Sequence, residues 1–365
     1  MRRVLLVLSV CLATIASACL NDRDSLADEV RLKPDVIWMI TGRFERNPQL
    51  YFEMRIRRVQ AELAKNPAQP DLYDDVSVAY ERLGKHGDAI DWIEKKRRLL
   101  EKMGPDATQD HDWYRYYANA GTFRVHDWVA NRGKRPLAEL KRAVSDIAEA
   151  IRLNPNAHFG REGYQLAALK WLLAVQTGST GTPLARSEWL SEQIAANRAA
   201  APDGIAGLIR LGGAWESPDI FDALAASLSS PRTRILRTMA LLRRNELLAK
   251  GIQPIGQMSQ ADVAPGDDDE PLYRRLRKSA EDWEKARSDF MMTRLRAGRH
   301  PDTDPSFWSG YVELPKPELP DLPFWERLTF RNTGPWVFLV LSVAAIVWKV
   351  LYDRNRQKKL AATAI

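Results

Sequence analysis

The chain of 365 residues contains only two cysteines, and both lie within the first 19 positions. Cys11 is part of an apolar run at residues 4–16, and Cys19 follows directly after it. A protein that has lost residues 1–18 keeps a single thiol and can form no internal disulfide. Its stability must then come from the packing of its side chains.

Residue patterns that carry chemistry are also scarce. The five histidines are never spaced as i and i+4, and zinc sites are hard to build without cysteines. The glycine-rich stretch at 178–182 is not followed by Lys-Ser or Lys-Thr, and no G-x-S-x-G elbow occurs. The acids at 267–270 lack the alternating spacing of a calcium loop. We therefore predict a protein that is not an enzyme, with no catalytic residue, metal or cofactor, and no small-molecule substrate.

The N-terminal residues have the features of an export signal. A basic start is followed by the apolar run and by Ala16-Ser17-Ala18, which predicts a signal peptide at residues 1–18. Cys19 is predicted to be lipidated, because its position resembles that of the cysteine in the bacterial lipobox. Ala16 departs from the leucine preferred there, so ordinary cleavage and an uncleaved anchor stay open. Because no Asn-x-Ser/Thr sequon occurs, we expect a bacterial envelope protein.

A second apolar run, at residues 335–352, predicts a transmembrane helix. Eighteen residues span about 27 Å as a helix, close to the thickness of the hydrocarbon core. Trp336 and Trp348 lie near its ends, Lys349 can reach the headgroups, and a basic tail follows. This pattern predicts a single-pass protein of the bacterial inner membrane, with its body on the periplasmic side and its tail in the cytoplasm. A buried core helix is the alternative.

The net charge of +7 comes mostly from the two ends of the chain. Arg2 and Arg3 contribute two of these charges, and residues 349–365 contribute a net four. The remainder is nearly neutral, so the high isoelectric point is no argument for nucleic-acid binding.

The middle of the chain is predicted to be all-α, because apolar residues recur there at helical spacing and no stretch alternates as a strand does. The predicted helices cover residues 51–64, 71–83, 87–103, 111–130, 136–153, 157–176, 183–200, 218–229, 231–250 and 271–298. The predicted layout is a signal peptide at 1–18, a helical-repeat domain at 19–250, an acidic linker at 251–270, a helix at 271–300, a proline-rich stalk at 301–331, a transmembrane helix at 332–352 and a basic tail at 353–365.

A pattern of large, small and large residues repeats in this body. The three triplets, each with spacings of four and three, are Tyr73-Ser77-Tyr80, Tyr116-Ala120-Phe123 and Phe159-Gly163-Leu166. They are offset by 43 residues each time. Residues three and four apart share one helix face, so each small residue leaves a notch for a second helix. We therefore expect Ala150, on a partner helix, and Gly163 to lie at close helix–helix contacts.

These features resemble the tetratricopeptide (TPR) repeat, with the best match at residues 73–93 and a total coverage of about 70–202. The offset exceeds the 34 residues usual in that family, and the second unit needs an insertion around 124–136. A HEAT-like solenoid, whose repeats run 40–47 residues, is the structural alternative. The stretch at 148–162 is then the turn between two units. We expect His158, Arg161 and Glu162 there to form a surface turn with a local ion pair, and not an active-site loop.

The resemblance implies protein–protein interaction and complex assembly, with a protein or peptide partner held in a concave groove. Carried over position by position, it implies that the groove contains Asp74, Glu81, Arg124, Gly160 and Tyr164. The alternative functions are a helical envelope enzyme, such as a hydrolase or lyase, and a lipoprotein that bridges two membranes. If the groove does not bind the partner, the region 217–296 becomes the better candidate.

Overall fold

The computed structural model describes residues 36–104, 110–155, 161–178, 201–211, 213–228, 233–255 and 269–319. These ranges contain helices, turns and irregular chain and no strand, which confirms the all-α prediction for them. Within them no helix is long and apolar enough to cross a membrane. The predicted leader, Cys19, the helix at 183–200, the transmembrane helix and the basic tail lie outside the described residues. The described residues up to Pro315 form one compact unit, and all the helices described belong to it.

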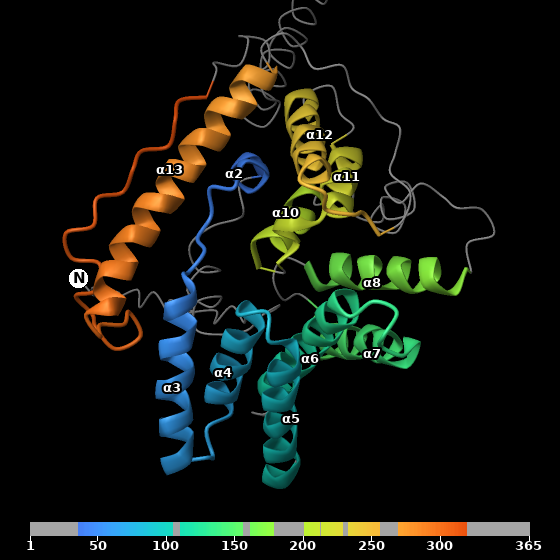
Figure 1. Cartoon of the computed structure of the whole chain (residues 1–365). Helices are drawn as coiled ribbons and strands as arrows, with labels where there is room; N and C mark the ends of the chain where they lie inside the picture. Colours follow the sequence, from blue (N-terminus) through green and yellow to red (C-terminus); the bar gives the residue numbers. More distant parts are fainter. Residues whose placement is uncertain are drawn as a thin grey trace, which may run out of the picture. The chain divides into compact units, whose positions relative to one another are not determined.

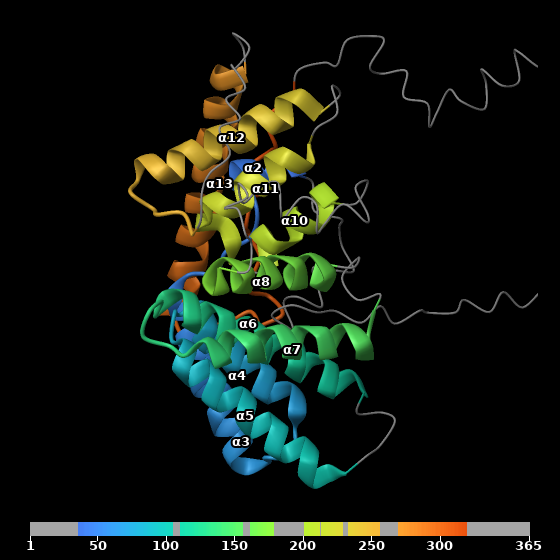
Figure 2. The ribbon, with the colours of Figure 1, turned by 90° about the vertical axis from the view of Figure 1, so that its right-hand side faces the viewer.

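Six helices in the first half of this unit pack in chain order. They are α3 (Gln49–Lys65), α4 (Pro70–Arg82), α5 (His86–Met103), α6 (Asp110–Ala130), α7 (Leu137–Leu153) and α8 (Arg161–Thr177). Each helix contacts the next, and α4 also contacts α6 directly. Figure 2 shows them as successive layers from α3 to α8. The first helices of the two predicted units are therefore direct neighbours.

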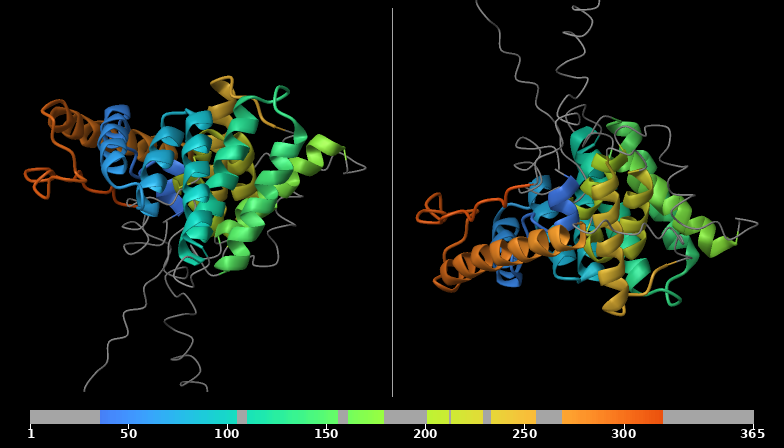
Figure 3. Two further views of the ribbon diagram at one scale, coloured as in Figure 1. Left: turned by 90° about the horizontal axis from the view of Figure 1, so that it is seen from below. Right: turned by 90° about the horizontal axis from the view of Figure 1, so that it is seen from above.

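The second half of the unit brings together segments that are far apart in the sequence. It contains α2 (Val36–Thr41), α10 (Ala201–Leu211), the short 3-10 helix η4 (Ala214–Glu216), α11 (Pro218–Ser227), α12 (Arg234–Ala249) and α13 (Asp269–Arg296). The short helix α2 contacts α10, α12 and α13, and it lies between α12 and α13 in Figure 1. The long helix α13 also contacts α3, beside which it lies in both views of Figure 3. Helix α13 thus joins the two halves.

Local sequence signals account for several helix boundaries. Pro70 begins α4, where its missing N–H costs nothing. Ser217 caps α11, since its side chain accepts a hydrogen bond from the N–H of Ile220 at 3.4 Å, and Pro218 follows in the first turn. Gly84 ends the α4 segment with φ of +70°, a conformation that suits glycine.

The prediction of helices missed α2 and α10. Helix α2 is only six residues long and is buried over Ile37–Thr41, so it has no polar face. Helix α10 is buried at seven of its first nine positions and contains two glycines. A helix as short and as buried on every side as α2 lacks the amphipathic spacing on which the prediction relied. In α10 the two glycines lower the helix propensity.

One of the two predicted close contacts is confirmed and the other is wrong. Ala150 is fully buried, in a cluster with Tyr114 and Ala118. Gly163 is exposed, and a Cβ atom added there would meet nothing within 4 Å. The notches are at other glycines. A Cβ atom on Gly121 would lie 2.8 Å from the side chain of Ile147, and one on Gly204 would collide with a tyrosine ring of α8.

The described part of the predicted proline-rich stalk at 301–331 is packed against the helices for most of its length. Residues 300–314 belong to the helical unit and run back along α13, as Figure 1 shows. Asp302 accepts two hydrogen bonds from Arg55 of α3, at 2.7 and 2.8 Å, and both side chains are buried. Trp283 of α13 donates to Glu313. Contacts with residues far away in the sequence hold this segment against the helices. Its proline content does not reveal these contacts.

Candidate functional site

The side chains predicted to form a binding groove lie inside the helical body. The exposed fraction is 0% for Asp74 and 6% for Glu81, both on α4, 2% for Arg124 on α6 and 6% for Tyr164 on α8. Gly160 lies outside the described residues. The expectation that these positions present an open surface is therefore wrong for the four described side chains. A role for them in partner binding stays a prediction.

Asp74 is the centre of a buried charge network between α4, α5 and α6. It accepts hydrogen bonds from Lys96 at 2.6 Å and Asn119 at 3.1 Å, and the Nε atom of Arg115 lies 3.1 Å away. Lys96 is fully buried and also reaches Asp112, at 3.4 Å. Buried charges are tolerated when they are paired in this way. The network holds three helices together.

The same network contains a group of acids with the spacing of a metal site. Carboxylate oxygens of Asp71, Asp74 and Asp112 lie within 4.8 Å of one another. Lys96 already lies between Asp74 and Asp112, and Arg115 pairs with Asp71 and Asp74. These two side-chain cations lie between the acids and offset two of the three negative charges, so a metal ion would have to displace them.

Glu81 binds two histidines. Its carboxylate contacts Nδ1 of His86, the first residue of α5, at 2.9 Å and Nδ1 of His126 on α6 at 2.6 Å. Burial alone would raise the pKa of Glu81, but these two bonds outweigh it and lower the pKa. The bond to Glu81 raises the pKa of His86.

Arg124 and Tyr164 also have structural partners. Arg124 pairs with Glu94 of α5 and with Asp146 of α7. Burial raises the pKa of Asp146 to about 6, although Arg124 opposes the rise. Tyr164 lies against Gly204 of α10, which has no side chain to exclude its ring.

The stretch at 148–162 is not a surface turn in its second part. Arg161 and Glu162 are both 2% exposed, and Tyr114 donates a hydrogen bond to Glu162 at 3.1 Å. The predicted ion pair between them is present, with 3.9 Å between nitrogen and oxygen. The two residues do not lie at the surface as expected, because neighbouring helices cover this end of α8. His158 lies outside the described residues.

Side-chain hydrogen bonds between α4, α6 and α8 join residues that are 43 to 48 positions apart in the sequence. Asp74 and Asn119 are 45 residues apart, and Gln165 donates to Thr122, 43 residues before it, at 2.8 Å. Glu81 and His126 are again 45 apart. The separations lie close to the 43-residue offset of the sequence triplets.

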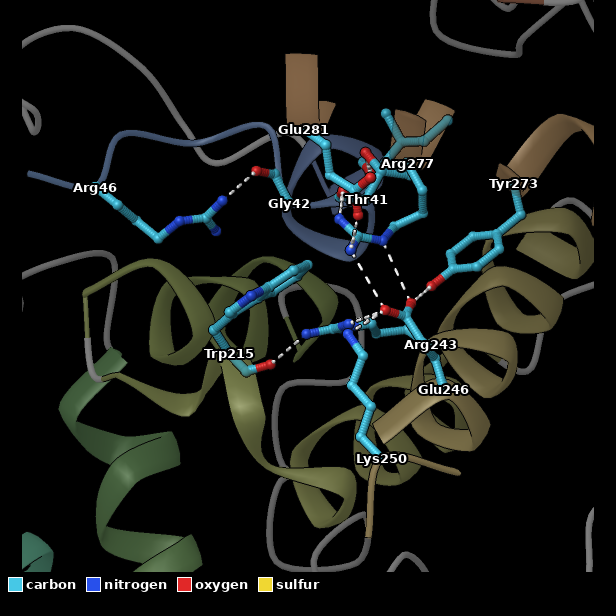
Figure 4. Close-up of polar contacts among 11 residues, drawn as sticks. Thr41, Gly42, Arg46, Trp215, Arg243, Glu246, Lys250, Tyr273, Arg277 and Glu281 are labelled. Atoms are coloured by element: carbon cyan, nitrogen blue, oxygen red, sulfur yellow. Dashed lines mark hydrogen bonds and ion pairs between the residues drawn. The ribbon is translucent and has the colours of Figure 1, made fainter. Parts of the chain in front are cut away.

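A second polar cluster, around Trp215, was not predicted from the sequence. Its side chains come from α2 and the residues after it, η4, α12 and α13 (Figure 4). The guanidinium carbon of Arg243 lies 3.8 Å from the centroid of the Trp215 ring, and those of Arg46 and Arg277 lie 5.3 Å away. A Cβ atom on Gly42 would lie 2.7 Å from the same ring. We call this group the Trp215 cluster.

Glu246 of α12 is the shared acceptor of the Trp215 cluster. Tyr273, Arg243 and Lys250 each donate to it at 2.8 Å, and Arg277 donates twice at 3.3 Å. Burial would raise the pKa of Glu246, but the bonds from Lys250 and Tyr273 and the two arginines lower it to about 2. Arg277 also donates to the carbonyl of Thr41 at 2.8 Å, which ties α2 to α13 (Figure 4).

Comparison with known proteins assigns the chain to no family. No family model, no curated protein and no solved structure matches the chain.

Within the described ranges, the two networks of α4–α8 and α12–α13 are closed. The acids in them are paired with cations that belong to the same network, and the bases are held by the same acids. Such sites stabilise helix contacts, whereas a catalytic acid or base must face a substrate. The only cluster here with ring nitrogens still available is the pair of histidines on Glu81.

Proposed function

We propose that this chain is a TPR-like helical-repeat protein of the bacterial envelope that binds a protein or peptide partner and assembles a complex. The observation that carries the proposal is the recurrence of hydrogen bonds between α4, α6 and α8 at 43 to 48 residues. The sequence triplets repeat at 43 residues, and the similar spacing of the contacts supports a repeating unit of about this length.

Repeat architecture supports a binding role. A single helix pair cannot bury its apolar face alone, so repeats stack and produce an extended surface. Such surfaces usually bind peptides or other proteins. The closed networks of the described residues favour the same conclusion over the enzyme alternative.

We also propose that the protein is located at the inner membrane of the bacterial envelope. A signal peptide, a lipidated Cys19 and a single inner-membrane helix at 332–352 would hold the helical unit on the periplasmic side. The support is the leader, the apolar run between two tryptophans, and the basic tail behind it.

Site-specific photo-crosslinking in cells tests the binding role. A crosslinking amino acid is placed at Arg98 on the exposed side of α5, and another at Lys278 on the exposed side of α13. We expect a discrete protein adduct from at least one position, and the same protein should copurify from gently solubilised membranes. Absence of an adduct at both, together with purification of the chain alone, would contradict the proposal.

If only Lys278 yields the adduct, the partner is bound by the region 217–296 and not by the repeat helices. In that case the protein still binds a partner, but through a surface of the region 217–296.

A further inference from the structure

His300 is buried at the start of residues 300–314, the segment that we call the strap. It is 4% exposed, and its ring stacks on that of Tyr51 of α3 with 4.5 Å between the centroids. Its Nε2 atom lies 3.0 Å from the carbonyl oxygen of Tyr51. Its Nδ1 atom accepts a hydrogen bond from the backbone N–H of Asp302 at 3.1 Å. One ring nitrogen therefore holds the strap on α3, and the other holds the turn with which the strap begins.

These two hydrogen bonds determine the protonation state of the ring. A carbonyl oxygen only accepts hydrogen bonds, so Nε2 carries the hydrogen, and a backbone N–H only donates, so Nδ1 offers a lone pair. Both bonds are satisfied only by a neutral imidazole with its hydrogen on Nε2. A second proton can bind only at Nδ1, where it would face the N–H of Asp302 and break that bond.

The charged groups around the ring come from α3 and from the strap itself. The carboxylate of Asp302, with an oxygen 3.5 Å from Nδ1, attracts a second proton, but it is already paired with Arg55 and Arg58 of α3. Burial lowers the pKa of His300, and the attraction of Asp302 and the bond to Tyr51 do not offset it. The two arginines lower the pKa further.

The turn at His300 comes before the other contacts of the strap. The N–H groups of Thr303 and Asp304 donate to the carbonyl of His300, at 3.1 and 2.9 Å. Further along, Phe307 is fully buried in a cluster that includes Tyr51 and Met291 of α13. Within the sequence 300–314, His300 is the only residue whose ordinary pKa lies near neutrality. It is therefore the group through which a change near neutral pH can act on the strap.

We propose that His300 makes the strap pH-sensitive: protonation of its ring opens the turn at 300–304 and loosens residues 300–314 from α3 and α13. Because folding lowers the pKa of His300 from 6.5, its contribution to the docked strap is complete above pH 6.5. That contribution is lost as the pH falls from 6.5 toward the lowered value.

Opening of the strap would change the reach of the chain. Fifteen freed residues can extend up to about 50 Å from the end of α13. In a protein anchored through its C-terminal residues, acid would thus lengthen the tether of the helical unit. This consequence rests on the proposed location at the membrane, whereas the opening itself does not.

Amide hydrogen exchange of the full-length protein in detergent tests the opening. Exchange is followed by mass spectrometry between pH 8 and 5 and corrected for the pH dependence of the intrinsic rate. In peptides that contain residues 300–310, the opening equilibrium should rise by up to tenfold per pH unit below 6.5, to roughly thirtyfold at pH 5. Peptides of α12 should show no such rise, because Glu246 stays ionised down to about pH 2. A change of less than twofold in the strap would overturn the proposal.

His300→Gln removes the titrating group and keeps an N–H donor for the carbonyl of Tyr51. The opening of its strap should be the same at pH 8 and pH 5. His111→Gln is the matched control, because His111 is exposed and the charged groups around it belong to α4, α5 and α6. It should retain the pH dependence of the wild type. A pH dependence that persists in His300→Gln would contradict the assignment to this ring.

A further measurement on the unmodified chain does not depend on the folding of a variant. The slow exchange of the imidazole Cε1 hydrogen, followed by mass spectrometry, reports the pKa of each histidine. We expect a midpoint below 6.5 for His300 in the native protein and a return to about 6.5 in urea. A native midpoint at or above 6.5 would overturn the proposal.

Discussion

Replacement of Glu246 by glutamine should remove much of the stability that the Trp215 cluster provides. Glutamine keeps the size and one oxygen acceptor, but it leaves Arg243 and Arg277 without their shared negative charge. The network lowers the pKa of Glu246 from 4.5 to about 2, and its side chain is 26% exposed. A difference of about 2.5 pH units corresponds to roughly 2–3 kcal/mol of unfolding free energy after allowance for solvent screening.

The lowered pKa of Glu246 determines how the stability difference between the two proteins changes with pH. A carboxylate whose pKa is lowered by folding stabilises the protein above the pKa of the unfolded state, which is near 4.5. That contribution is lost as the pH falls through the folded-state value of about 2. The difference in stability between the wild type and Glu246→Gln should therefore be constant above about pH 5 and shrink toward zero between about pH 4.5 and 2.

Urea denaturation of the two full-length proteins in detergent, followed by circular dichroism at several pH values, measures this difference. Glu281→Gln is the matched control, because Glu281 also pairs with Arg277, at 2.8 Å, but is 58% exposed. Its effect should stay below about 0.5–1 kcal/mol. A Glu246→Gln variant as stable as the wild type at pH 7, or a difference that is the same at pH 3 and pH 7, would refute the reasoning.

Four further predictions follow from the fold and from the proposed address. Gly204→Ala should lower the melting temperature, because the new methyl group collides with the facing ring. Gly163→Ala should leave the melting temperature unchanged or raise it, because alanine adds up to about 0.5–1 kcal/mol of helix propensity to the unfolding free energy; equal melting curves for the two variants would contradict this. Asp74→Ala should destabilise the body by about 3–5 kcal/mol in urea unfolding, because it leaves buried cations unpaired; a neutral effect would show that the network does not hold the helices. Labelled fatty acid should enter the wild type and not Cys19→Ser, and both should stay in the membrane fraction if the C-terminal helix is an independent anchor; an unmodified N-terminal cysteine by intact mass would remove the lipidation claim. A reporter that works only in the cytoplasm should be active when fused to the C-terminus and silent when fused after Gly251; the opposite pattern would invert the topology.

Most helices of the repeat body could be predicted from the sequence because each has one apolar face. The predicted ranges 51–64, 71–83 and 111–130 differ from α3, α4 and α6 by at most two residues at either end. Apolar spacing, capping residues and prolines are local signals, and local signals determine where a helix begins and ends.

The positions of the charged side chains could not be predicted in the same way. Asp74 and Arg124 were expected in an open groove because the resemblance to the TPR repeat places them there, position by position. Their burial depends on partners on other helices, such as Lys96 and Asp146, and no local pattern reveals such partners. The Trp215 cluster has the same origin, since it combines side chains from four separate segments.

The error at Gly163 has a simple cause. A small residue within a periodic pattern predicts a notch only if a second helix lies opposite. In the structure, α10 packs on α8 through Gly204 of α10 and Tyr164 of α8, and not at Gly163. Sequence reasoning found the right helix and the wrong face.

The contact of α2 with α13 determines how the protein would respond to tension. Arg277 bonds to the carbonyl of Thr41, and Arg43 contacts both Ser279 of α13 and the carbonyl of Leu314. A pull between the first described residues and residue 314 would therefore load this junction directly. Because Asp302 is bonded to Arg55 of α3 and α13 contacts α3, helix α3 would share that load, whereas the middle of the chain between α3 and α13 would be bypassed.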